Sequence, residues 1–180
     1  MPTYRLEAIR FRCIDESGVD WTGSDEPYFV FTTSLEQTPG ASTTVRSREF
    51  GSIDSGDTLA FKPPLVLANN VPGGIATSLV VMEADAGNSD KVVSKIEKGL
   101  AVARWAAKIW LGVDPRDLDK QVLAYLKRWY DDDVLAQRTV TWAPWELAQG
   151  CPNVGSSVTE EVGYKGSANY TVTYRVTRVT

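Results

Sequence analysis

The chain has 180 residues, of which 43% are hydrophobic and 23% charged; this balance suits one globular domain and excludes a largely disordered chain. Its formal net charge is −4, and its Lys and Arg residues form no cluster of the kind that marks a nucleic-acid partner. Because the sequence contains no histidine, imidazole-based catalysis and zinc sites built on imidazole are excluded; a metal would bind mainly to oxygen, as calcium and magnesium do.

Short strand patterns separated by turns fill the first half of the chain. Thr3–Ile14 alternates apolar and charged side chains, and the change of phase at Ala8–Ile9 predicts a β-bulge. Proline cannot donate to a sheet ladder, so Pro63 and Pro64 are expected to stop the strand before them. Several short strands of this kind indicate a sandwich or a barrel. The four strands expected after the first are Tyr28–Thr33, Ser42–Arg48, Thr58–Lys62 and Ile75–Glu83.

The spacing of the apolar residues becomes helical over residues 91–137. A first helix is predicted from Lys91 to Leu111, with Gly112 just past its end, and a second helix begins at the cap Asp114. We expect the apolar faces of this hairpin to pack on each other and on a sheet; the alternatives are a partner surface and a face that lies on a membrane. The tryptophans on these faces are Trp105, Trp110 and Trp129.

Strand character returns near the carboxyl terminus. Strands are predicted at Arg138–Trp142 and at Ala168–Val179, where tyrosine and valine alternate with threonine and arginine. The predicted fold class is therefore mainly β: an antiparallel β-sandwich of about eight strands. The α-helical hairpin at residues 91–137 is inserted within this sandwich, and residues 1–180 form a single domain.

The cysteines and the amino terminus bear on the cellular location. Cys13 and Cys151 belong to no CxxC motif, and we expect buried thiols, with a disulfide between them as the alternative. The chain enters a strand pattern at once, without a signal peptide, which favours the cytoplasm. No run of about 20 apolar residues occurs, so no transmembrane segment is expected.

Two acidic loops are the main candidates for a functional site. The segment Asp15–Pro27 carries five carboxylates and two glycines between two predicted strands, and the segment Glu83–Asp90 follows the end of another strand. Gathering carboxylates without a cation costs Coulomb repulsion, so such loops either stay open in water or bind a cation. Calcium takes six to eight oxygen ligands of this kind. Two such loops, far apart in sequence, predict a calcium site, with solvated acidic turns as the alternative.

The first loop resembles that of the C2 domain. Its end, Ser24-Asp25-Glu26-Pro27-Tyr28, is similar to the Ser-Asp-Pro-Tyr of that family, and Glu83-Ala84-Asp85 is similar to the Asp-x-Asp of its third loop. The chain departs from the family in its longer first loop, in Glu83 where aspartate is typical, and in the helical hairpin. The resemblance implies Ca²⁺ as the cofactor. It implies these metal ligands: Asp15, Asp20, Asp25, Glu83, Asp85 and Asp90.

Three functions follow from these observations. The first is a calcium-binding, non-enzymatic module that docks to a phospholipid or protein surface through the two acidic loops, with Trp21 of the first loop suited to a lipid interface. The second is a structural or protein-interaction domain that uses the helical hairpin, with calcium absent or only stabilising. The third is a small hydrolase that depends on carboxylates, although no catalytic motif is recognisable.

Overall fold

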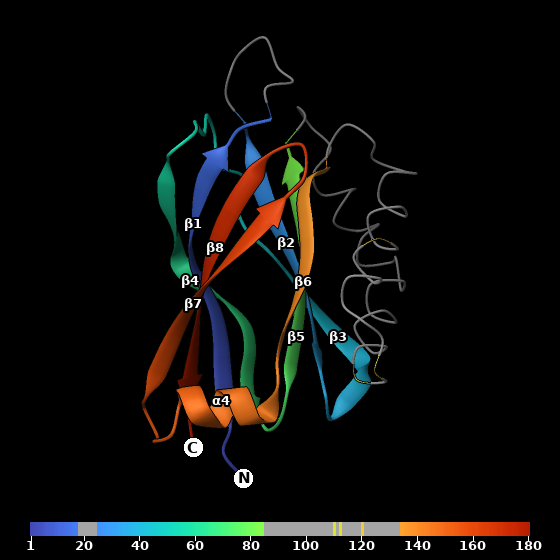
Figure 1. The fold of residues 1–180 in the computed structure, drawn as a ribbon, viewed down its shortest axis with the longest axis vertical. Coiled ribbons are helices and arrows are strands. Elements are labelled where there is room, and N and C mark those ends of the chain that lie inside the picture. The colour runs from blue at the N-terminus through green and yellow to red at the C-terminus, as the bar shows by residue number, and fades with distance from the viewer. Residues whose placement is uncertain (18–24, 85–109, 111, 113–119, 121–133) are drawn as a thin grey trace.

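The computed structural model describes residues 1–17, 25–84, 110, 112, 120 and 134–180. In this part of the chain, eight strands form two four-stranded antiparallel sheets, in the orders β4-β1-β8-β7 and β3-β2-β5-β6 (Figure 1). A short helix, α4, connects β6 to β7. The elements are β1 (Tyr4–Asp15), β2 (Pro27–Leu35), β3 (Thr38–Arg46), β4 (Thr58–Val71), β5 (Ile75–Glu83), β6 (Val134–Trp142), α4 (Pro144–Gly150), β7 (Ser157–Lys165) and β8 (Asn169–Arg178).

Aromatic side chains fill the space between the two sheets. Phe11 of β1 and Phe29 of β2 have ring centroids 4.5 Å apart, and Phe50, Phe61 and Tyr170 surround them at 4.7–6.4 Å. All five rings are buried. Tilted and edge-to-face contacts of this kind add to the stabilisation that comes from burying apolar area. The alternation of β1 therefore points one set of side chains into this core and leaves the arginines outside.

The predicted sandwich is confirmed, and so is the bulge in β1, where the register with both neighbours shifts between Ala8 and Arg10. The prediction that β4 stops at Pro63 was wrong, because the strand runs on to Val71. β4 lies at the edge of its sheet, where one side of the strand needs no donor and proline is tolerated. Strand β7 and helix α4 were not predicted. The two cysteines are both free and buried, so the alternative of a disulfide was wrong.

Most of the predicted helical hairpin lies outside the described residues. Its last four residues belong instead to β6, which begins at Val134 because Val134 pairs with Met82 of β5. Within the segment, Gly112 has a φ of +85°, the left-handed conformation expected of a residue just past a helix end, and Lys120 is helical. Trp110 packs on the β4–β5 turn: a Cβ atom added at Gly74 would come within 2.6 Å of its Cη2 atom. No helix among the described residues is long and apolar enough to cross a membrane.

Candidate functional site

The two acidic loops start side by side at one end of the sandwich. Pro27, the first residue of β2, pairs with Glu83, the last residue of β5, and the Ala84 N–H donates to the Glu26 carbonyl over 3.0 Å. Strands β1 and β5 both end there, opposite α4 and the two termini (Figure 1). The antiparallel pairing of β2 with β5 therefore brings together two segments that are more than fifty residues apart in sequence.

Asp25 lies at the base of the first loop and is only 2% exposed. Its backbone forms a bridge with Ile53, in the loop between β3 and β4. Its Oδ1 atom accepts a hydrogen bond from the Ser17 hydroxyl at 2.6 Å, and its Oδ2 atom accepts one from the Tyr170 hydroxyl at 2.6 Å. The Ser17 N–H lies 3.3 Å from both oxygens. A buried carboxylate is tolerated when it accepts hydrogen bonds in this way.

Cys13 and Tyr170 line the buried side of this carboxylate. Burial is the main reason that the pKa of Cys13 rises to about 11, and the negative charges of Asp25 and, to a smaller extent, Glu16 raise it further. Burial, together with the hydrogen bond to Asp25 and its charge, also raises the pKa of Tyr170 far above its ordinary value. Both groups therefore stay neutral at physiological pH, and Tyr170 remains a hydrogen-bond donor to Asp25.

Glu16 is a member of the site that the sequence reasoning missed. Its Oε2 atom is buried and accepts no hydrogen bond within the described part of the chain, while its backbone N–H donates to the Ser55 hydroxyl at 3.1 Å. Its charge acts on Cys13, as does that of Asp25, so the two carboxylates lie near the same thiol. A buried carboxylate oxygen without a donor is costly, and a cation would satisfy it. The Glu16 Oε2 atom is therefore an oxygen donor of the kind that calcium binds.

The other predicted ligands differ in their exposure and in whether the structure describes them. Asp15 is exposed, with the Asn169 amide 3.5 Å from its Oδ2 atom, and Glu83 is half-buried. Within the described ranges, no three Asp, Glu or Cys side chains are close enough together to hold one metal ion. The structure thus brings Asp15, Asp25 and Glu83 to one end of the sandwich but does not join them in one ligand shell. Three predicted ligands lie outside the described residues: Asp20, Asp85 and Asp90.

Comparison with known proteins gives similarity in fold only. No family model matches the chain, and no curated protein matches it in sequence. The chain is similar to a C2 domain, the one lettered A, of plant extended synaptotagmin 1, with 5% identity and a TM-score of 0.46, over 99% of this chain and 94% of that one. It is also similar to human GIVD cytosolic phospholipase A2, with 8% identity and a TM-score of 0.47, over 99% of this chain but 17% of the phospholipase. A structure of the same phospholipase in complex with a fluorophosphonate inhibitor and terbium chloride has a TM-score of 0.44.

The two sheets and the starting points of the acidic loops both match the sandwich fold expected from the sequence. The described residues form two antiparallel sheets of four strands, the number that the C2 resemblance implied. The two loops that carried this resemblance in the sequence leave the sandwich at the same end. The protein is a mainly β, antiparallel two-sheet sandwich with an acidic end.

Proposed function

We propose that this protein is a calcium-binding, non-enzymatic module that docks to a phospholipid or protein surface through its acidic end. The observation that supports the proposal is the pairing of Pro27 with Glu83, which sets the end of the first acidic loop beside the start of the second. The buried Glu16 Oε2 atom, which lacks a donor among the described residues, supports the choice of a cation. The ion would bind to oxygen atoms of Glu16, Asp15, Asp25 and Glu83. Ligands would also come from the rest of the two loops: Asp20, Asp85 and Asp90.

The protein's own groups prepare this end for a cation. Ser17 and Tyr170 hold the Asp25 carboxylate through hydrogen bonds of 2.6 Å, so that this side chain loses little further freedom when an ion binds. Bound calcium would supply two positive charges. The loops would then change from a negative surface, which repels anionic lipid, to one that attracts it. Trp21, in the first loop, would enter the lipid interface, where indole is favoured.

Thermal unfolding tests the calcium part of the proposal. Saturating calcium should raise the melting temperature of the wild type, since a ligand at about 100 times its Kd adds about 2.7 kcal/mol of stability. Glu16→Gln should reduce this rise, because the neutral amide binds calcium more weakly. The control is Glu160→Gln, which removes one charge from β7 at a position that lines a pocket beside α4. An equal rise in all three proteins would contradict a site at the acidic end.

Vesicle sedimentation tests the docking part. Wild-type protein should pellet with vesicles of phosphatidylserine and phosphatidylcholine in calcium and stay in the supernatant with a chelator. Trp21→Ala should pellet less, while keeping the rise in melting temperature with calcium. If calcium raises the melting temperature but no protein pellets, the lipid surface is excluded and a protein surface is the docking target. Pelleting that persists in the chelator would contradict docking through calcium.

A further inference from the structure

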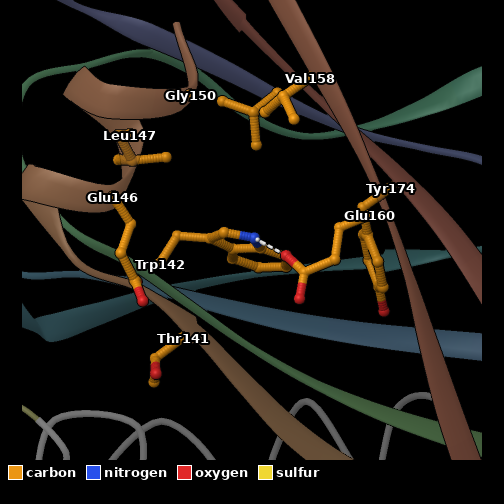
Figure 2. A pocket seen from close by; sticks show the side chains of 9 residues that line it. Thr141, Trp142, Glu146, Leu147, Gly150, Val158, Glu160 and Tyr174 are labelled. Atoms are coloured by element: carbon orange, nitrogen blue, oxygen red, sulfur yellow. Dashed lines mark hydrogen bonds between the residues drawn. The ribbon is translucent and has the colours of Figure 1, made fainter.

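A pocket lies away from the acidic end, where α4 packs beside β6, β7 and β8 (Figure 2). It has a volume of about 200 Å³ and is lined by polar and aromatic side chains together with aliphatic ones. Two glutamates, Glu146 of α4 and Glu160 of β7, flank the indole of Trp142, which ends β6 (Figure 2). The pocket therefore combines an aromatic surface with two negative charges.

Both carboxylates are held in place by N–H groups. Glu160 Oε2 accepts a hydrogen bond from the Trp142 indole N–H at 2.7 Å, and Glu146 Oε2 accepts one from the Ala143 backbone N–H at 2.7 Å. Neither carboxylate has a Lys or Arg partner within ion-pair distance in the part of the chain that the structure describes. The pocket thus offers two carboxylates that form no ion pair with a Lys or Arg among the described residues.

The aromatic surface is also fixed. The Trp142 ring is 5% exposed and packs edge-on against Tyr174, with ring centroids 5.2 Å apart and an interplanar angle of 63°. Leu147 lines the same pocket from α4, and Gly150 lies close against Val158, because a Cβ atom added at Gly150 would come within 3.1 Å of the Val158 Cγ1 atom (Figure 2).

We propose that this pocket binds the guanidinium group of an arginine side chain from a partner protein. A planar guanidinium offers five N–H donors in a fixed fork and can donate to more than one carboxylate at the mouth of the pocket, whereas the Trp142 ring, only 5% exposed, leaves no open face for stacking. An anion would be repelled by Glu146 and Glu160, and a neutral ligand would leave both charges unpaired. Among the described residues, Arg138 is a cation near Tyr174 of this pocket, and its Nη1 atom donates to the Gly163 carbonyl at 3.1 Å.

Exposed apolar residues in the pocket wall and nearby in sequence point to a polypeptide as the source of the guanidinium. Val158, which lines the pocket, is 40% exposed, and Trp145, next to Glu146 on α4, is 66% exposed. Val154, between α4 and β7, is 65% exposed. Apolar residues on either side of a partner arginine would cover these side chains, whereas a small free guanidine would leave them in water. The site does not depend on calcium, because it is built from other elements than the acidic loops.

A nuclear magnetic resonance titration of the full chain tests this proposal, with the Trp142 indole N–H signal, assigned by comparison with Trp142→Phe, as the readout. N-acetyl-arginine methylamide should shift this signal, and its neutral isostere N-acetyl-citrulline methylamide should not. Glu160→Gln should weaken binding at least tenfold, because the amide oxygen still accepts from Trp142 but the charge is gone. The matched control is Glu161→Gln: Glu161 is the next residue of β7, on the opposite face, where it pairs with Arg10.

Three results would overturn the proposal. The first is equal shifts with the arginine and citrulline probes. The second is unchanged binding in both Glu160→Gln and Glu146→Gln; Glu146→Gln is included in case Glu160→Gln does not fold. The third concerns the source. A blocked Leu-Arg-Leu peptide should bind several-fold more tightly than agmatine, a free guanidine, and Trp145→Ala should reduce that difference; equal affinities would assign the pocket to a small guanidine instead of a polypeptide.

Discussion

At the residue scale, the buried carboxylate of Asp25 is the centre of the acidic end. Its oxygens accept hydrogen bonds from the Ser17 and Tyr170 hydroxyls, and its charge helps to raise the pKa of Cys13. The group therefore has two roles. It stabilises the join between β1, β8 and the first loop while its donors are present, and under the proposed function it is also a calcium ligand.

Tyr170→Phe separates these two roles. The substitution removes the hydroxyl that donates to Asp25 Oδ2, and we expect the free energy of unfolding to fall by about 1–3 kcal/mol because a buried carboxylate oxygen loses its donor. Urea denaturation in calcium-free buffer measures the change. In a double-mutant cycle with Asp25→Asn, the two losses should be coupled by about 0.5–3 kcal/mol. Strictly additive losses would mean that the hydrogen bond contributes nothing to stability.

Cys13 provides a test that depends on pH. Its pKa is 9.0 for an ordinary thiol and about 11 in the fold, so the folded chain keeps a proton that the unfolded chain loses between these values. The contribution of Cys13 to stability is therefore fully present below pH 9.0 and is lost as the pH rises to about 11. The unfolding free energy of the wild type should fall more steeply over this window than that of Cys13→Ala, in which Tyr170 still titrates at high pH. Parallel curves would contradict the burial of this thiol beside Asp25.

The sequence allowed part of this site to be predicted. Asp15, Asp25 and Glu83 were recognisable because each stands next to a strand pattern, and the structure brings all three to one end. Glu16 was not recognisable, since it follows the last residue of β1 and no strand pattern sets its direction. The burial of its Oε2 atom depends on the three-dimensional packing of this end, which no local pattern reports.

At the scale of the elements, each strand or helix that was not predicted has a local physical reason for being missed. Strand β7 was missed because Val162 and Tyr164 are its only buried side chains, so its alternation is weak. Helix α4 has seven residues, too few for a helical period, yet Pro144 in its first turn and the Glu146 carboxylate on the Ala143 N–H mark its start. The long strands β2 and β5 were predicted, because both are buried along almost their whole length.

The turn between β7 and β8 gives a prediction at this scale. A Cβ atom at Gly166 would lie 2.1 Å from the Leu135 carbonyl oxygen, because Gly166 bridges to Ala136 and joins the two sheets. Gly166→Ala should therefore lower the free energy of unfolding by about 1–3 kcal/mol or more, since backbone atoms cannot move aside as a flexible side chain can.

Gly163→Ala is the matched control for this change. Gly163 lies three residues earlier, in β7, and nothing stands within 4 Å of a Cβ atom added there. The unfolding free energy of Gly163→Ala should stay within about 0.5 kcal/mol of that of the wild type. Urea denaturation of both variants makes the comparison. Equal stability of Gly166→Ala and Gly163→Ala would contradict the close approach of β6 to the β7–β8 turn.

At the scale of the whole molecule, the sandwich separates two candidate binding regions. The acidic end carries the proposed calcium site, and the pocket beside α4 carries the proposed site for an arginine. Because no side chain belongs to both regions, although β8 contributes to each, substitutions in one should leave the other unchanged, as is usual for sites without shared contacts. The module would then hold a surface at one end and a protein partner at the other.

A calorimetric titration of calcium is the most direct test of the central claim. The wild type and Glu160→Gln should give the same saturable heat, and Glu16→Gln should bind calcium at least tenfold more weakly, a loss of about 1.4 kcal/mol or more in binding free energy. Asp25→Ala combined with Asp85→Ala should abolish the heat. No heat in the wild type, together with an unchanged melting temperature at millimolar calcium, would contradict the proposal that the acidic end binds calcium.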